Sequence, residues 1–199
     1  MQFRQRFSPE FLSNVWPQIG GGTTYWKQEI FSNDASTCGQ VELTTVNAYN
    51  RGFPQMYSQC GADGFEVDLG NGDYLLEQGD TSTTGYNCHY HSANNGPGSC
   101  FTYPSNAWVT FYWEVQIGTF GQPNSAIRAW VAQDGGPYAE WINMPNHVLN
   151  EDTPGADYDM VTLLPYMTGR DSTVSAGPTA YTWYDELIVS TAPIAAPDN

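Results

Sequence analysis

Positively charged residues are scarce in this chain, and most of them fall on predicted strands. Lysine and arginine number six against 21 acidic residues, which gives a net charge of −15. If they share one face, four of these cations would form a positive cleft: Arg4, Arg6, Lys27 and Arg128. β-Elimination from a uronic acid needs cations that neutralise its carboxylate and a base that removes the adjacent proton. Tyr112 is the candidate base; the alternative is that all these residues simply cover the exposed side of a sheet.

Two carboxylates point to a different reaction. Glu66 and Asp68 lie two residues apart on a predicted strand, so their side chains share one face. A retaining glycosidase needs two carboxyl groups about 5–5.5 Å apart, one as nucleophile and one as proton donor. Asn71 stands where a further carboxylate would complete the set, and an amide is not a carboxylic acid. An exposed acidic strand is therefore the favoured interpretation.

Two of the three histidines lie close together in the sequence. His89 and His91 flank Tyr90, and His147 is the third histidine of the chain. On an extended segment the pair points to one side, which suits a transition metal if His147 or an acid completes the ligands. His91 is also a candidate base, because histidine titrates near neutral pH. The alternative is that these are polar loop residues.

The segment Trp108–Gly136 predicts two strands joined by a Gly/Pro/Asn turn, because apolar and polar residues alternate along it. One face carries the apolar residues Val109, Phe111, Trp113, Val115, Ile117, Ile127, Ala129 and Val131. The other face combines aromatic and hydrogen-bonding side chains, a mixture that suits sugar rings. The candidate ligand-binding residues, on this face and on other segments, are Lys27, Glu114, Gln116, Arg128, Trp130 and Trp141.

Composition narrows the class of protein. A chain of 199 residues fits one β-sandwich domain. The strongly acidic charge argues against nucleic acid or an anionic membrane surface as partner. No apolar run approaches the roughly 20 residues of a membrane span, so no membrane insertion is expected. No signal peptide precedes the first predicted strand, and the chain is expected to be a mature form or an excised piece.

The four cysteines are expected to form two disulfides and to place the protein outside the cell. They are even in number and contain no CxxC motif, so their spacing does not suit a zinc site. Three pairings exist. We favour sequential pairing, which closes two short loops, Cys38–Cys60 and Cys88–Cys100. Disulfides persist in oxidising, extracellular settings.

Short strands separated by turn residues, with little helical periodicity, predict an all-β, single-domain antiparallel β-sandwich of the jelly-roll type. The domain is expected to span residues 1–192, with 193–199 as a tail or linker stub. Ser8–Trp16 is expected to be a short helix or a turn, with Ser8 as the N-cap and Pro9 at the first helical position. Two segments are expected to be long connections, Thr81–Ser105 and Trp141–Asp159. The remaining predicted strands are Gln2–Phe7, Tyr25–Phe31, Val41–Val46, Gln55–Gln59, Gly64–Leu69, Tyr74–Leu76, Met160–Met167 and Tyr181–Thr191.

Several segments together resemble the concanavalin A-like lectin/glucanase superfamily, and within it the secreted bacterial polysaccharide lyases and their non-catalytic relatives. The segments that carry the resemblance are FRQRF, WKQEIF, WVTFYWEV, the turn Trp130–Gly135 and the final WYDELIVS. The resemblance implies that Arg4 or Arg6 supplies the arginine of a lyase cleft and Gln28 its glutamine. It also implies a candidate structural Ca²⁺. The acidic loops Asp68–Asp80 and Glu151–Asp159 offer oxygen ligands for such an ion, and Asp185 and Glu186 could equally serve. No cofactor is expected to be required.

These observations favour a secreted protein that acts on a polysaccharide by β-elimination in a concave cleft. The catalytic set would be Tyr112, Arg4, Arg6, Gln28 and His91. Two alternatives stay open. One is a non-catalytic glycan-binding module that uses Tyr112, Trp130 and Trp141, and the other is a structural domain of a larger extracellular protein or assembly. The oligomeric state is left open.

Overall fold

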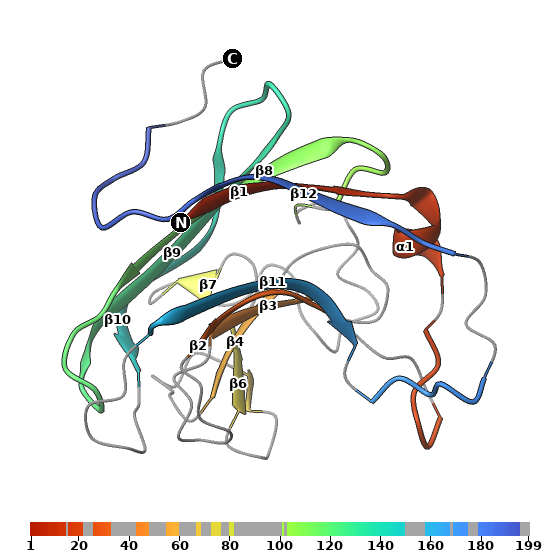
Figure 1. Cartoon of the computed structure of the whole chain (residues 1–199). Helices are drawn as coiled ribbons and strands as arrows, with labels where there is room; N and C mark the ends of the chain where they lie inside the picture. Colours follow the sequence, from red (N-terminus) through yellow and green to blue (C-terminus); the bar gives the residue numbers. More distant parts are fainter. Residues whose placement is uncertain are drawn as a thin grey trace.

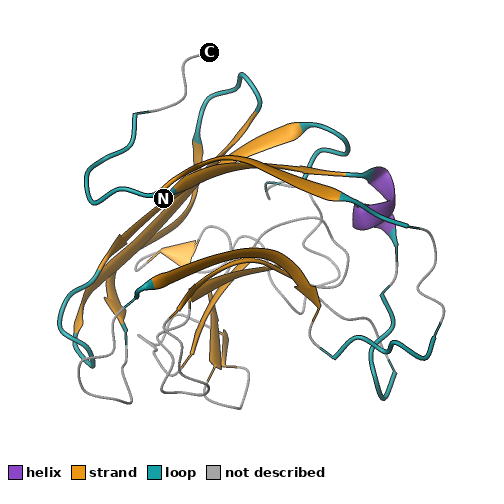
Figure 2. Ribbon diagram, viewed as in Figure 1, coloured by secondary structure: helices purple, strands orange, loops and turns teal. Residues whose placement is uncertain are grey.

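Two β-sheets pack face to face in the computed structural model, with one short helix at one end (Figure 1, Figure 2). The structure describes residues 1–14, 16–21, 26–32, 43–47, 55–59, 67–68, 73–76, 80–81, 101, 103–149, 158–167, 169–174 and 179–195. For the strands between residues 43 and 81, and for Trp141, only the backbone is described.

Sheet 1 contains the first and last strands of the chain and the long central hairpin. Its strand order is β12-β1-β8-β9-β10-β7, and all neighbours are antiparallel except β10 and β7. The bounds are β1 (Gln2–Phe7), β7 (Asp80–Thr81), β8 (Trp108–Gln116), β9 (Pro123–Gln133), β10 (Ala139–Val148) and β12 (Thr182–Ile188).

Sheet 2 is antiparallel throughout, in the order β11-β2-β3-β4-β6-β5. Its strands are β2 (Trp26–Ser32), β3 (Leu43–Asn47), β4 (Gln55–Gln59), β5 (Val67–Asp68), β6 (Asp73–Leu76) and β11 (Met160–Met167). Figure 1 shows the sheets curving in the same sense, so that β1, β8 and β12 arch over β11, β2 and β3. The face of sheet 2 that turns away from sheet 1 is therefore the concave side of its curve.

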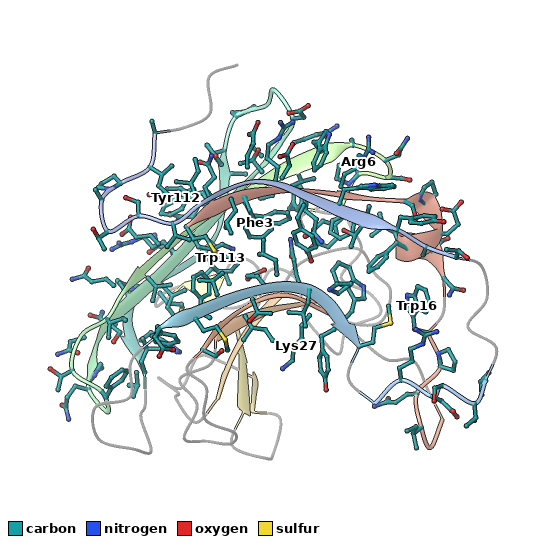
Figure 3. All side chains as sticks on the ribbon, viewed as in Figure 1. Phe3, Arg6, Trp16, Lys27, Tyr112 and Trp113 are labelled. Atoms are coloured by element: carbon teal, nitrogen blue, oxygen red, sulfur yellow. The ribbon has the colours of Figure 1, made fainter. Side chains whose placement is uncertain are left out.

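The core lies between the sheets and is rich in aromatic rings. Alternate residues of β1 and β8 point into it, so that Phe3 and Phe111 are fully buried with ring centres 5.2 Å apart. At one end, Phe7 packs 5.2 Å from Trp26 and 4.6 Å from Tyr103, which joins sheet 1 to sheet 2. Figure 3 shows the Phe3 and Trp113 side chains in this space. Burying large aromatic surfaces is the main stabilising contribution.

Helix α1 (Pro9–Ser13) closes this end of the sandwich. Its N-cap is Ser8, whose Oγ accepts a hydrogen bond from the backbone N–H of Phe11 at 3.3 Å. Proline at the first position costs nothing there because its missing N–H would have no intrahelical partner. The helix turns the side chain of Phe11 into the core, 4.8 Å from Trp26. The predicted cap and helix start are confirmed.

The predicted antiparallel β-sandwich is confirmed, and so are the two faces of the Trp108–Gly136 hairpin. The predicted connection Trp141–Asn150 was wrong, since most of it belongs to β10. This strand was missed because Pro145 interrupts it and its register shifts next to Ile142 and His147, which breaks the period-two pattern. The predicted disulfides involve Cys38, Cys60, Cys88 and Cys100, which lie outside the described residues.

Candidate functional site

The predicted site residues do not form one cleft. Arg4, Arg6, Tyr112 and Arg128 lie on the outer side of sheet 1, because they alternate with core residues of β1, β8 and β9. Lys27 belongs to sheet 2 and points away from sheet 1 (Figure 3). The four cations expected on one face therefore lie on opposite faces of the sandwich.

Two of the three arginines of sheet 1 are neutralised by carboxylates. Arg4 binds Asp134 at 2.7 Å and Glu186 at 3.3 Å. Arg128 forms an ion pair with Glu114, its register partner on β8. An anionic substrate would have to displace these carboxylates first. On this geometry, Arg4 and Arg128 are poorly placed to receive a uronate.

Arg6 packs against aromatic rings and forms no ion pair among the described residues, whereas Arg4 adds its ion pairs to a contact with the Trp108 ring, 5.1 Å from its Cζ. The Arg6 Cζ lies 4.4 Å from the centre of the Trp183 ring and 5.2 Å from that of Trp108. Both tryptophans are its register partners, on β12 and β8 respectively. Cation–π contacts of this kind leave the edge of the guanidinium group available for hydrogen bonds.

Tyr112 belongs to an aromatic group on the outer side of sheet 1. Its ring stacks on that of Trp130 at 5.2 Å and lies 6.3 Å from Tyr138. The Tyr138 hydroxyl donates to Gln2 Oε1 at 3.2 Å. Burial, followed by the neighbouring Tyr112, raises the pKa of the Tyr138 phenol. The group offers ring surface and polar edges, as the sequence predicted for this face.

A pocket of about 480 Å³ adjoins this group at the end of β8. Tyr112, Glu114 and Gln116 line it from the strand, and residues 189–194 line it from the C-terminal segment. It therefore brings together three of the predicted catalytic and ligand-binding residues. Its lining mixes carboxylate, amide and hydroxyl groups with apolar side chains, which is the mixture that a sugar requires.

Gln28 lies in the interior of the sandwich. Its side chain is fully buried, and its Oε1 accepts a hydrogen bond from the Tyr103 hydroxyl at 2.9 Å. Its backbone oxygen accepts another from the Tyr184 hydroxyl, also at 2.9 Å. Burial, with the nearby Glu29 as a smaller cause, raises the pKa of Tyr184 well above its usual range. These bonds tie sheet 2 to sheet 1.

Lys27 and Tyr166 meet on the concave side of sheet 2. They are register partners on β2 and β11, and the Lys27 Nζ lies 5.6 Å from the centre of the Tyr166 ring. The Tyr166 side chain is 49% exposed. The same register continues through Val46 on β3 to Gln55 on β4. The pair thus places a cation and a phenol side by side on an accessible face.

Tyr166 is not among the site residues that the sequence predicted. It lies in the mostly apolar run MVTLLPYM, which predicts a buried strand rather than a reactive side chain. The register between β2 and β11 shifts between Leu163 and Tyr166, so the pairing with Lys27 does not follow from alternation. The one available signal was the proline before the tyrosine, because a proline within a strand points to an edge strand.

The other predicted ligands are only partly described. His147 is fully buried on β10. Asp185 lies on the exposed β12, where its carboxylate accepts a hydrogen bond from the Glu186 N–H at 2.9 Å. Within the described residues, no three His, Cys, Asp or Glu side chains gather as metal ligands do, and no helix is long and apolar enough to span a membrane. Glu66, Asn71, His89 and His91 lie outside the described residues, and for Asp68 and Trp141 only the backbone is described.

Comparison with known proteins identifies the fold. No protein-family model matches the chain, and no curated protein matches it. Among solved structures, the chain is similar to the marine PL-14 alginate lyase from Aplysia kurodai, with a TM-score of 0.58 and 12% sequence identity. The similarity covers 92% of this chain and 66% of that one, so the chain spans about two thirds of the lyase's length. The protein therefore has a polysaccharide lyase-like β-sandwich fold.

Proposed function

We propose that this protein is a polysaccharide lyase that cleaves a uronic-acid-containing polysaccharide by β-elimination. The observation that carries the proposal is the Lys27–Tyr166 pair on the concave side of sheet 2, with Nζ 5.6 Å from the ring centre. The fold shared with an alginate lyase supports it. The choice of a uronate as substrate follows from this chemistry, because an ammonium group pairs with a carboxylate.

The two side chains supply complementary parts of the reaction. The Lys27 ammonium group pairs with the uronate carboxylate, which makes the proton on C5 more acidic and stabilises the charge that develops when it leaves. The Tyr166 oxygen takes that proton as the general base. The electron pair of the C–H bond becomes the C4–C5 double bond, and the glycosidic oxygen leaves C4 and takes up the proton that Tyr166 removed.

Position supports the choice of Lys27 as the cation. It lies on the concave side of sheet 2 beside the exposed Tyr166, whereas the arginines of sheet 1 lie on the opposite face of the sandwich. On a protein of net charge −15, a polyanion is repelled at long range and needs a local cation where it binds. Lys27 provides one on the concave face, next to an exposed tyrosine.

The setting of the reaction is also proposed. We infer a concanavalin A-like domain that works outside the cell, because four cysteines without a zinc-like spacing favour two disulfides. A structural Ca²⁺ with Asp185 among its ligands belongs to the same proposal. Added Ca²⁺ should raise the apparent melting temperature of the parent protein and should have no such effect on Asp185→Asn. An unchanged melting temperature of the parent would contradict the proposal.

A second candidate function is glycan binding without cleavage. The observation that favours it is the stack of Tyr112 on Trp130 beside a pocket of about 480 Å³. The exposed parts of these rings could pack against the CH face of a sugar, while Glu114 and Gln116 bind its hydroxyls. Such a module would hold polysaccharide on sheet 1 and would need nothing from Lys27.

One assay separates the two functions. The protein is incubated with alginate, glucuronan, pectin and glycosaminoglycans, and ultraviolet absorbance follows the unsaturated product. A steady rise with one of these polymers is expected. Flat traces with all of them would contradict the lyase proposal. Retarded migration in gels that contain polysaccharide, without any rise in absorbance, would instead favour the glycan-binding module.

A further inference from the structure

We propose that the outer side of sheet 1 carries a second, non-catalytic site that binds an acidic sugar. It consists of Arg6, the two tryptophans beside it, Trp108 and Trp183, and the neighbouring Tyr181. We call these four residues the Arg6 site. The choice of a uronate as the sugar rests on the proposed function; the site itself rests on the geometry described next.

The guanidinium group of Arg6 is fixed in place. Three neighbouring strands hold it, because Arg6 on β1 is the register partner of Trp108 on β8 and of Trp183 on β12. The ring centres lie 5.2 Å and 4.4 Å from its Cζ. A guanidinium held in this way has lost most of its rotamer freedom before a ligand arrives, so binding costs less conformational entropy.

Arg6 also has unused hydrogen-bonding capacity. Its Nε is buried and meets no hydrogen-bond acceptor within the described part of the chain, so a ligand would reach the group through its terminal N–H groups. Among those residues it forms no ion pair, whereas Arg4 binds Asp134 and Glu186. Arginine presents N–H donors in a plane that matches a carboxylate, and charge-assisted bonds of this kind are strong. A ligand carboxylate is therefore the natural partner for this group.

Aromatic surface lies next to this cation. Tyr181 is 57% exposed, and its ring stacks on that of Trp183 with centres 5.9 Å apart and planes 23° apart. Trp183 is 36% exposed. An exposed ring accepts the CH face of a pyranose, while the carboxylate of the same or the next sugar reaches Arg6. Together these groups recognise an amphipathic sugar that carries a negative charge.

The Arg6 site and the Lys27–Tyr166 pair lie on opposite faces of the sandwich (Figure 3). A single short stretch of polysaccharide cannot reach both sites at once, so the Arg6 site would bind a second stretch of the polymer. Holding the polymer at a second point raises its effective concentration near the first. The Arg6 site should therefore matter for long polysaccharides and not for short ones.

Binding measurements on a variant without Lys27 test the proposal. Isothermal titration of Lys27→Met with uronate oligosaccharides should still show binding. Adding Tyr181→Ala should weaken it about threefold, and adding Arg6→Gln should weaken it about tenfold or more. Arg170→Gln is the matched control, because Arg170 also lies over an indole ring, 5.2 Å from Trp16, away from this site. It should leave the affinity unchanged.

Two results would overturn the proposal. One is that adding Tyr181→Ala leaves the affinity of the Lys27→Met variant unchanged. The Tyr181 side chain is exposed, so its removal should not disturb the fold. The other is equally tight binding of oligosaccharides whose carboxylates have been reduced to alcohols. Failure of the lyase proposal is separate, because it would show as absent turnover while binding at the Arg6 site persists.

Discussion

Lys27 and Tyr166 are register partners on adjacent antiparallel strands, and the ammonium nitrogen of one lies 5.6 Å from the ring centre of the other. The strands that carry them, β2 and β11, lie far apart in the sequence and meet at one edge of sheet 2. Tyr166 is half exposed, so a polymer can reach the pair from the concave side. The pairing of β2 with β11 therefore places a cation, Lys27, beside a candidate base, Tyr166.

The first prediction concerns the hydrogen bond that joins the sheets. Tyr184→Phe removes the hydroxyl that donates to the backbone oxygen of Gln28 and leaves the ring in place. Because that oxygen then loses a buried partner, the free energy of unfolding should fall by about 1–2 kcal/mol in urea titrations. Tyr181→Phe, on the same segment but exposed, should change it by less than about 0.5 kcal/mol. Equal effects of both variants would contradict this account.

The second prediction concerns high pH. Burial raises the pKa of Tyr184 far above its ordinary value of 10.0. Above about pH 10 a tyrosine of the unfolded chain loses its proton while folded Tyr184 keeps it, so the unfolded state binds fewer protons. Stability should therefore fall as pH rises beyond 10, by up to about 1.4 kcal/mol per pH unit from this residue.

The Tyr184→Phe variant provides the comparison for that pH dependence. Its stability should fall less steeply with pH in the same range, whatever its stability at neutral pH. Chemical unfolding at a series of alkaline pH values measures both slopes. Identical slopes for parent and variant would show that Tyr184 ionises equally in the folded and unfolded states.

The third prediction concerns salt. The protein carries a net charge of −15 and its proposed substrate is a polyanion, so the two repel each other at long range. Raising the ionic strength from roughly 0.01 M to roughly 0.15 M shortens the screening length from about 30 Å to about 8 Å. The kcat/KM for a polyuronate should rise severalfold over this interval. A steady fall from the lowest salt concentration would mean that local attraction dominates.

The fourth prediction concerns the turn between β8 and β9. A Cβ at Gly118 would lie 2.5 Å from the backbone oxygen of Asn124, which is too close for any side chain. Gly118→Ala should therefore lower the free energy of unfolding by about 1–3 kcal/mol. Thr119→Ala, at the next and exposed position, should have little effect. Thermal unfolding followed by circular dichroism measures both.

The sequence predicted strands well where the alternation was regular. Phe111 and Tyr112 fell on the expected sides of β8, because period-two alternation in a half-buried strand records burial directly. It failed for β10, where Pro145 and shifts of register interrupt the pattern. The local sequence pattern predicts the burial of residues within a single strand, and it does not identify strands whose alternation is interrupted.

The candidate site could not be predicted in the same way. Alternation shows which side of a strand Arg6 or Lys27 occupies, but it does not show which sheet each strand joins. Strand pairing placed β1 in sheet 1 and β2 in sheet 2, and so separated two cations that the sequence suggested could lie together. The same long-range pairing brought Tyr166 to Lys27, which no local pattern indicated.

The most direct test of the proposed function is the kcat/KM of Tyr166→Phe on the polyuronate that the parent cleaves. Loss of the base predicts a fall of about 10²- to 10⁴-fold with unchanged thermal stability, and Lys27→Met should fall similarly. Arg170→Gln, which removes a cation that lies away from both proposed sites, should keep full activity. Full activity in Tyr166→Phe, or a loss seen instead in Tyr112→Phe, would contradict the placement of the reaction at Lys27 and Tyr166.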